Sequence, residues 1–134
     1  MKKYVLDACA LIAFLKKEDG CEIVKDIISG DYEVFLHSVN FLEVYYKLLR
    51  ELGREKSDLI CEEIIKLPIK IIYSTDLFFI KTAGYFKANY RMSLGDSFVL
   101  ATAKLNSASI VTSDKHEFGI VENKEPNLSF RWIR

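Results

Sequence analysis

The sequence has few of the residues that usually mark a cofactor or metal centre. Its six glycines form neither a G-x-G-x-x-G motif nor a Walker A loop, which argues against binding of dinucleotides or nucleoside triphosphates. His37 and His116 are too isolated for a catalytic triad, and structural roles are expected for both. The three cysteines, Cys9, Cys21 and Cys61, are widely spaced and form no C-x-x-C pair, so neither a disulfide framework nor a zinc site is indicated. A reduced, cytoplasmic setting is expected.

The chain also lacks an excess of charge of either sign. Its 19 basic and 19 acidic residues cancel, so no global positive field indicates a nucleic-acid partner, although local basic patches remain possible. Half of the 134 residues are hydrophobic, which is ample for one packed core. With no repeat, low-complexity segment or long linker, we expect a single domain over residues 1–134.

The opening segment MKKYVLDACALIAFLKK imitates a signal peptide, because two lysines precede an apolar run. Asp7 interrupts that run, and its longest uninterrupted part extends only from Ala8 to Leu15. Lys16 and Lys17 then stand where small cleavage-site residues should be. We therefore expect neither a signal peptide nor a membrane-spanning segment.

Strand-like and helix-like segments alternate along the chain. Strands are expected over residues 3–7, 32–37, 69–74, 108–114 and 128–134. Helices are expected over residues 8–17, 21–29, 38–53, 56–67, 75–90 and 93–106, with Ser38 as the cap of the third and Gly53 at its end. This alternation predicts an α/β fold, a three-layer α/β/α sandwich around a central, mainly parallel sheet.

Four carboxylates stand where such a sheet would bring them together. Asp7 closes the first strand and Asp114 the fourth, so both open onto the same edge if these strands are neighbours. Glu43 lies in the second turn of the helix after the second strand, and Asp96 lies in the first turn of another helix. Ligands of open parallel sheets bind beyond the carboxyl ends of the strands, so the four acids are expected to converge there.

Three of these acids also have ordinary structural explanations. Asp7 can cap the helix that follows it. Asp114 can cap a short helix, with Glu117 completing a capping box. Glu43 and Lys47 are spaced as an i,i+4 ion pair on a solvated helix face.

Asp96 is harder to explain as a surface residue. It shares its side of the helix with Val99, Leu100 and Ala103, and no cation lies three or four residues further on. Ser93 and Asp96 do have the spacing of a capping box, which is the structural alternative. A buried carboxylate without a partner is costly, so its retention suggests a use.

A divalent cation would account for all four acids together. Carboxylates within about 5 to 8 Å of one another cannot all stay ionised unaided, because like charges raise each other's pKa. Oxygen ligands without a histidine or cysteine cluster favour Mg²⁺ or Mn²⁺ over zinc. A cation held in this way can in turn bind phosphate oxygens.

The segments that carry these acids resemble a known family. YVLDACALIAFL, the glutamate of SVNFLEVYYKL, MSLGDSFVLATA and IVTSDKHEF occur in that order over nearly the whole chain. Together they resemble a PIN-domain ribonuclease, in particular a VapC-type toxin of a type II toxin–antitoxin pair. The resemblance implies a central parallel sheet with helices on both sides and a metal site at its carboxyl edge.

The resemblance also implies a role for each matching residue. It implies that one or two Mg²⁺ or Mn²⁺ ions are held, and catalysis carried, by Asp7, Glu43, Asp96 and Asp114. Thr112 and Ser113 match positions that orient a carboxylate or a bound water, and Asn40 and Glu117 are further candidates. One departure is Ala8, which stands where a serine or threonine often follows the first aspartate, so one hydroxyl is missing and the coordination shell stays open.

The activity implied by the resemblance is metal-dependent hydrolysis of RNA phosphodiester bonds, which leaves a 5′-phosphate and a 3′-hydroxyl. A homodimer and a cognate antitoxin protein are implied as partners. The alternative is a catalytically weak PIN-like module that serves as an RNA- or protein-binding adaptor, a reading that Ala8 favours.

Residues that would contact RNA are less clearly marked. A basic rim or, equally, a solvated helix face is formed by Lys47, Arg50, Arg54, Lys56 and Arg91. Aromatic residues at helical spacing, expected in the core or a subunit interface rather than stacked on bases, are Phe78, Phe79, Tyr85, Phe86 and Tyr90.

Overall fold

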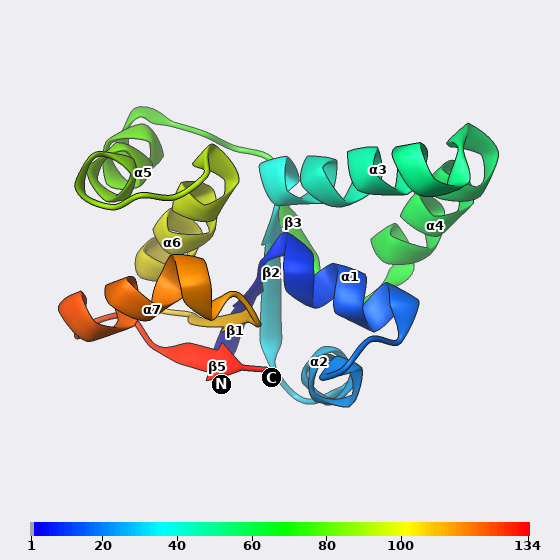
Figure 1. The fold of residues 1–134 in the computed structure, drawn as a ribbon, viewed down its shortest axis with the longest axis horizontal. Coiled ribbons are helices and arrows are strands. Elements are labelled where there is room, and N and C mark those ends of the chain that lie inside the picture. Colours follow the sequence, from blue (N-terminus) through cyan, green and yellow to red (C-terminus); the bar gives the residue numbers. More distant parts are fainter. Residues whose placement is uncertain (1) are drawn as a thin grey trace.

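The computed structural model describes residues 2–134, which form one five-stranded sheet flanked by helices (Figure 1). All strand pairings are parallel, and the strand order is β3-β2-β1-β4-β5. The strands are β1 (Lys3–Leu6), β2 (Glu33–His37), β3 (Lys70–Ile72), β4 (Ser109–Thr112) and β5 (Phe130–Trp132). The helices are α1 (Ala8–Lys16), α2 (Cys21–Ser29), α3 (Ser38–Leu52), α4 (Arg54–Lys66), α5 (Leu77–Asn89), α6 (Leu94–Asn106) and α7 (Lys115–Lys124). The predicted three-layer α/β/α architecture is confirmed.

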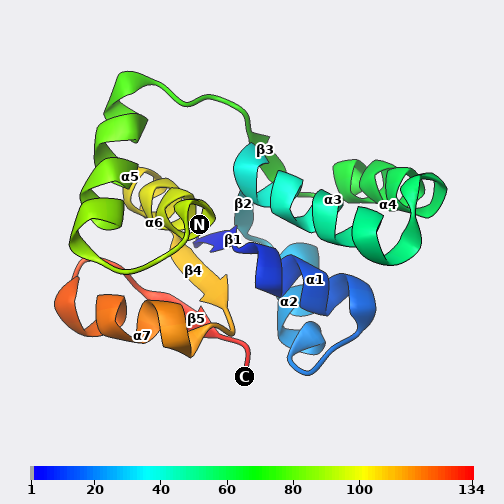
Figure 2. The same ribbon diagram turned by 45° about the horizontal axis from the view of Figure 1, so that its top comes forward.

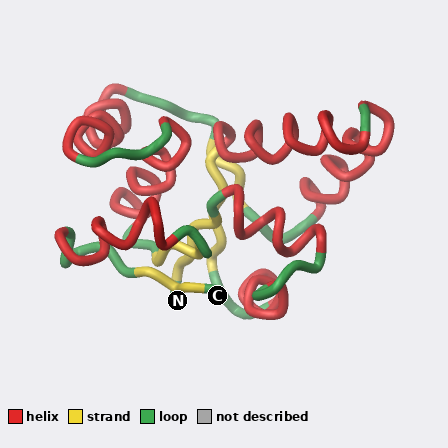
Figure 3. The backbone as a smooth tube through the Cα atoms, in the orientation of Figure 1, coloured by secondary structure: helices red, strands yellow, loops and turns green. Residues whose placement is uncertain are grey.

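The helices form two layers, one on each side of the sheet. Helices α1 to α4 lie on one side and α5, α6 and α7 on the other, which Figure 3 shows as two groups flanking the strands. Successive side chains of a strand point to opposite faces. In β1, Tyr4 and Leu6 therefore pack in the core under α1 to α4, whereas Val5 packs in the core under α5 to α7.

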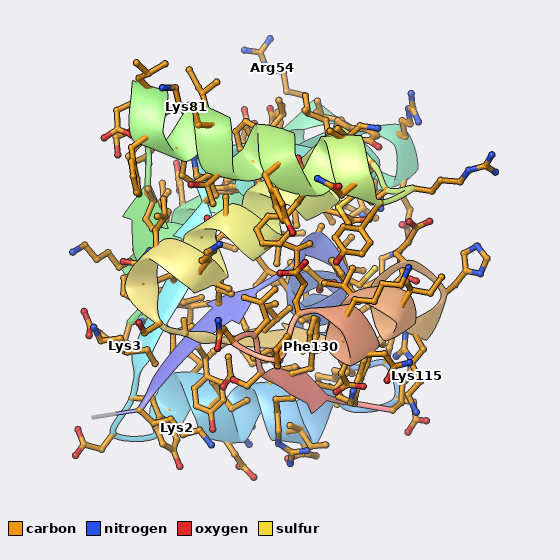
Figure 4. All side chains as sticks on the ribbon, turned by 90° about the vertical axis from the view of Figure 1, so that its left-hand side faces the viewer. Lys2, Lys3, Arg54, Lys81, Lys115 and Phe130 are labelled. Carbon is orange, nitrogen blue, oxygen red and sulfur yellow. The ribbon has the colours of Figure 1, made fainter. Side chains whose placement is uncertain are left out.

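Figure 4 views the molecule from the side of α5, α6 and α7. Its labelled Phe130 lies close to α7, and the Phe130 ring stacks on that of Trp132 with 5.5 Å between the ring centroids. Phe79 and Phe86 of α5 are buried, as expected of core positions, whereas Phe78 and Tyr85 on the same helix are exposed. Helix α5 thus has apolar side chains on two faces, and only one of them contacts the core.

The order of the strands positions the site. The chain winds outward from β1 through β2 to β3, and then crosses back to place β4 on the other side of β1. In β1 and β4, Leu6 pairs with Val111, so the strands expected to be neighbours are neighbours. Open parallel sheets bind ligands at the point where the winding reverses, beyond the carboxyl ends of the strands. Here that point lies directly after Leu6 and Thr112.

Some predicted boundaries are wrong. Helix α4 begins at Arg54, two residues earlier than expected, because Gly53 with φ +81° turns the chain between α3 and α4 in a single residue. The helix after Asp114 is not short, since α7 continues to Lys124 with Phe118 and Val121 both buried.

The cap of α3 is His37, not Ser38. The His37 Nδ1 accepts a hydrogen bond from the Val39 N–H at 3.1 Å. Helix α3 therefore begins directly from the last residue of β2.

None of the helices formed by residues 2–134 has the length and hydrophobicity to span a lipid bilayer.

Candidate active site

Asp7 is buried at the carboxyl end of β1, with only 3% of its surface exposed. Its Oδ1 accepts a hydrogen bond from the Ala10 N–H at 2.7 Å, which caps α1, and its Oδ2 accepts one from the Thr112 hydroxyl. Removal from water raises the pKa of Asp7 to about 7, against the opposing effect of these two hydrogen bonds. Nearby negative charge on Asp96 and Asp114 raises this pKa further. Capping fixes the Asp7 carboxylate without neutralising it. Asp7 can therefore both cap α1 and serve as a ligand of a cation.

Thr112 connects the two acids that follow β1 and β4. Its hydroxyl donates to Asp7 and accepts a hydrogen bond from the Asp114 N–H at 3.0 Å. Asp114 Oδ1 in turn accepts from the Glu117 N–H at 3.1 Å and caps α7. This buried threonine thus fixes the Asp7 carboxylate relative to the backbone that follows β4.

Glu43 comes to the site from α3 and meets the first turn of α6. The Asn40 side-chain amide donates to Glu43 Oε1 at 2.8 Å and to the Gly95 carbonyl oxygen at 3.0 Å. A Cβ atom at Gly95 would lie only 2.6 Å from Glu43 Cδ and 2.8 Å from Oε2, so the close approach requires glycine. Figures 1 and 2 both show the start of α3 beside the start of α6.

The ion pair with Lys47, which was the structural alternative for Glu43, does not form. The ion pairs within residues 2–134 do not include it, and the Glu43 carboxylate is bound by Asn40 instead. Glu43 is half-buried against α6 rather than free in solvent.

Asp96 lies close enough to several other acids for their charges to affect its pKa. Ser93 caps α6 by accepting the Asp96 N–H at 3.1 Å, and the Asp96 side chain is half-buried. Burial raises the pKa of Asp96 to about 6, and negative charge on Asp114, Glu43 and Glu117 adds to the rise. We call the group of Asp7, Glu43, Asp96, Asp114 and Glu117 the acidic site.

The acidic site does not supply a complete set of ligands for a cation. Within residues 2–134, no three histidine, cysteine, aspartate or glutamate side chains form a ready-made metal-ligand group. The acidic site therefore does not suit a cation that takes all of its ligands from the protein. Mg²⁺ keeps several of its waters and is commonly held by one or two carboxylates together with substrate phosphates, so oxygen ligands such as Asp7 and Asp96 suit it without a complete protein cage.

A pocket of about 610 Å³ borders the acidic site on the side of α7. Glu117 contributes to its wall together with Arg91, His116 and Lys124. Neither Arg91 nor Lys124 belongs to an ion pair in the described part of the chain. Two positive side chains without a carboxylate partner among the described residues therefore line the same pocket as Glu117.

The other basic residues considered from the sequence lie elsewhere. Arg54 pairs with Asp58 at 3.6 Å and points away from the molecule in Figure 4. Arg50 lies over the Tyr46 ring, at 4.9 Å from its centroid. Lys47 lines a smaller cavity of about 340 Å³ between α1 and α3. The structure therefore does not gather these residues into one basic rim.

The family follows from a sequence profile described as PIN domain, which matches residues 4–123. The chain belongs to the PIN domain family. This confirms the family expected from the order of its acidic segments, and no curated protein sequence matches the chain.

Solved structures of PIN domains share the fold at low sequence identity. VapBC2 from Rickettsia felis, bound to a DNA fragment from its promoter, has a chain that is 16% identical with a TM-score of 0.75, over 96% of this chain and 97% of that one. DNA-bound VapBC from Salmonella typhimurium is 18% identical with a TM-score of 0.73, over all of both chains. VapC20 from Mycobacterium tuberculosis, a toxin that cleaves the sarcin–ricin loop, is 12% identical with a TM-score of 0.64, over 79% of this chain and 85% of that one. The PIN domain described here thus has the fold found in VapBC toxin–antitoxin complexes.

Proposed function

We propose that this PIN domain is a divalent-metal-dependent endoribonuclease and the toxin of a VapBC-type pair. The observation that carries the proposal is the burial of Asp7 at the reversal point of the sheet, where both its oxygens are held and further acids surround it. Such an arrangement is unfavourable for an empty protein, and a cation of Mg²⁺ or Mn²⁺ type would relieve it. The fold shared with VapBC complexes supports the same assignment.

The residues proposed to hold the cation and to carry catalysis are Asp7, Glu43, Asp96 and Asp114. When bound, the cation supplies a water of lowered pKa and offsets charge on the phosphate. Thr112 donates a hydrogen bond to Asp7, and the Asn40 amide donates one to Glu43. A carboxylate of the acidic site accepts the proton of the attacking water. The water oxygen bonds to phosphorus as the bond to the 3′-oxygen breaks, and the leaving 3′-oxygen takes up a proton from solvent, which gives a 5′-phosphate and a 3′-hydroxyl.

RNA phosphates on either side of the cut need cations that are not already paired. Arg91 and Lys124 meet this need because they line the pocket beside Glu117. The acidic site alone would repel a polyanion, so basic side chains at its border help to bring the strand to it.

The test compares RNA cleavage by the wild-type chain and by Asp96→Asn in the presence of Mg²⁺ or Mn²⁺. Loss of a ligand should reduce the cleavage rate by about 100-fold or more. Asp26→Asn, a change at an exposed acid of α2, is the matched control and should leave the rate unchanged. Full activity of Asp96→Asn would refute the assignment.

The adaptor alternative is favoured by two observations. Ala8 supplies no hydroxyl next to Asp7, and within residues 2–134 the acids form no ready-made ligand group. An adaptor would bind RNA with the same affinity whether or not metal is present and would leave the RNA intact. Metal-dependent cleavage that Asp96→Asn abolishes would rule it out.

The proposed partners are an antitoxin and a second copy of the chain. The antitoxin is supported by the VapBC complexes that share the fold. The homodimer is supported by apolar side chains at the start of α5, where Leu77 and Phe78 are 66% and 68% exposed. Exposed apolar side chains of this size at one place suit a subunit interface.

A further inference from the structure

Asn40 lies where the first turn of α3 meets the first turn of α6. Its side chain is only 1% exposed. The amide nitrogen donates both of its hydrogens, one to Glu43 on its own helix and one to the Gly95 carbonyl, 55 residues further along the chain. Asn40 therefore ties the Glu43 carboxylate to the helix that carries Asp96.

The oxygen of the same amide, unlike the nitrogen, has no hydrogen-bond partner in the described part of the chain. Asn40 Oδ1 is buried and is the one buried side-chain polar atom within residues 2–134 that has no hydrogen-bond partner. Burial of a polar atom without a partner is unfavourable, and an apolar side chain of similar size would avoid it. A residue retained only for packing would not carry this amide, so its role lies in the groups that its nitrogen holds.

Glu43 needs such a restraint because its surroundings are acidic. The Glu43 carboxylate lies against Gly95, the residue before Asp96, so the negative charges of Glu43 and Asp96 repel each other. The Gly95 backbone leaves space for the Glu43 carboxylate but offers it no donor side chain. The hydrogen bond from the Asn40 amide to Glu43 Oε1 opposes this repulsion.

We propose that Asn40 is a positioning residue of the acidic site, which fixes the Glu43 carboxylate beside the first turn of α6 so that Glu43 and Asp96 can serve one cation. The inference rests on the proposed metal dependence. It assigns to Asn40 no contact with the RNA. Asn40 affects cation binding only by positioning the Glu43 carboxylate.

A double-mutant cycle tests this coupling through Mn²⁺ affinity, measured by electron paramagnetic resonance on the full chain without RNA. Asn40→Ala should weaken Mn²⁺ binding about ten-fold in the wild-type background. In the Glu43→Gln background, the same substitution should change the affinity by less than about two-fold, because the carboxylate that Asn40 positions is gone. Should Asn40→Ala fail to fold, Asn40→Ser replaces it, since a short hydroxyl cannot reach both Glu43 and Gly95.

Asn106→Ala is the matched control. The Asn106 amide donates to the Thr102 carbonyl at 2.8 Å near the far end of α6, so its loss removes one comparable hydrogen bond away from the acids. Both alanine variants should lower the melting temperature of the metal-free chain, but only Asn40→Ala should change Mn²⁺ affinity.

Two results would overturn the inference while leaving the proposed function intact. One is wild-type Mn²⁺ affinity in Asn40→Ala, and the other is an equal loss of affinity in both backgrounds. A wild-type chain that binds no Mn²⁺ at millimolar concentration would instead remove the proposed metal dependence, and the inference with it.

Discussion

Asp7 is held by two hydrogen bonds in a place that disfavours its charge. The Ala10 N–H and the Thr112 hydroxyl fix its oxygens, yet burial and neighbouring acids still raise its pKa to about 7. Its ionisation therefore opposes folding in the absence of a cation. A protein under selection for stability alone would not keep a carboxylate there.

The first prediction concerns the pH dependence of stability for Asp7→Asn in the absence of metal. Well below pH 3.8, Asp7 is largely protonated in both folded and unfolded chains. As the pH rises from the ordinary value of 3.8 to about 7, Asp7 ionises more readily in the unfolded chain, so the free energy of unfolding falls. Asparagine does not ionise, so at pH 8 the variant should be more stable than wild type by on the order of 3 kcal/mol.

Urea unfolding in the presence of a chelator, at pH 4.5 and at pH 8, measures this difference. The stabilisation should be small at pH 4.5 and large at pH 8. The same variant should lose RNA cleavage at both pH values. A stability difference independent of pH would contradict the burial argument.

The second prediction contrasts two helical glycines. Alanine favours a helix interior over glycine by about 1 kcal/mol. At Gly84 on α5, a Cβ would meet nothing within 4 Å, so Gly84→Ala should raise the free energy of unfolding by about that amount. At Gly95, the Cβ would collide with the Glu43 carboxylate, so Gly95→Ala should displace Glu43 and weaken Mn²⁺ binding about ten-fold. Unchanged Mn²⁺ affinity in Gly95→Ala would show that Glu43 does not need its observed position.

The sequence reveals the acids, and the family resemblance points to Thr112 and Asn40, but neither reveals which atoms these two side chains bind. Asp7 and Asp114 are recognisable because each follows a strand, which is a local pattern. The bond from Thr112 to Asp7 joins residues 105 positions apart, and that from Asn40 to Gly95 joins residues 55 apart. Only the packing of one element against another determines such pairs, so spacing along the chain could not identify them.

At the scale of elements, the junction of β2 and α3 depends on a buried histidine. His37 Nδ1 caps α3, and Nε2 lies 3.2 Å from the Ser74 carbonyl oxygen, so the neutral ring with its proton on Nε2 satisfies both contacts. The ring also stacks on Phe79 of α5, with 4.9 Å between centroids. The ring thus links α3, which carries Glu43, to the loop that leads into α5.

The third prediction is a loss of stability in acid that depends on His37. Burial lowers the pKa of His37 below the ordinary 6.5, since the charged ring is poorly solvated. The stabilisation from the neutral ring is complete above pH 6.5 and is lost as the pH falls through the lowered folded pKa. Between pH 7.5 and pH 5, His37→Gln should therefore lose less stability than wild type.

Thermal melts at the two pH values give the comparison. At pH 7.5, His37→Gln should be the less stable chain because the cap and the ring packing are lost. His116→Gln is the control, since His116 is exposed at the start of α7 and takes no part in the junction of β2 and α3. An identical pH dependence in all three chains would contradict the prediction.

Most helices and strands were predictable because each is marked by a local sequence pattern. Apolar runs bounded by Gly53, by Pro68 and by the cap Ser93 gave helices and strands close to those observed. The errors occur where tertiary contacts decide. Helix α7 extends past Phe118 because Val121 also reaches the core, and His37 rather than Ser38 caps α3 because the ring is fixed from the other side by Ser74.

At the scale of the molecule, repulsive acids and attractive cations lie side by side, and RNA binding should depend on the cations. The fourth prediction is that Arg91→Ala raises the KM for RNA several-fold with little change in kcat, because Arg91 lines the pocket but is not part of the acidic site. It should also lower the salt dependence of RNA binding by about one counterion.

Arg54→Ala is the control for this prediction. Arg54 carries the same charge but points outward and pairs with Asp58. Equal effects of the two substitutions would mean that net charge, and not the pocket beside Glu117, governs RNA binding.

The last prediction concerns assembly through α5. This helix buries Phe79 and Phe86 in the core but leaves Leu77, Phe78 and Ile80 exposed to solvent. A lone apolar side chain on a surface needs no explanation, whereas several at the start of one helix indicate a covered face. Phe78→Lys should therefore convert a dimer into a monomer, as measured by light scattering after size-exclusion chromatography.

Lys81→Ala, a change on the same helix in which no apolar side chain is lost, should leave the dimer intact. Because Phe78 is 68% exposed in the single chain, its replacement should leave the monomer's melting temperature almost unchanged. A dimer that survives Phe78→Lys, or a wild-type chain that stays monomeric at high concentration, would show that the start of α5 is not the subunit interface. If the dimer dissociates while Mn²⁺ affinity is retained, each subunit holds a complete acidic site, as the contacts of Asp7, Glu43 and Asp96 within one chain imply.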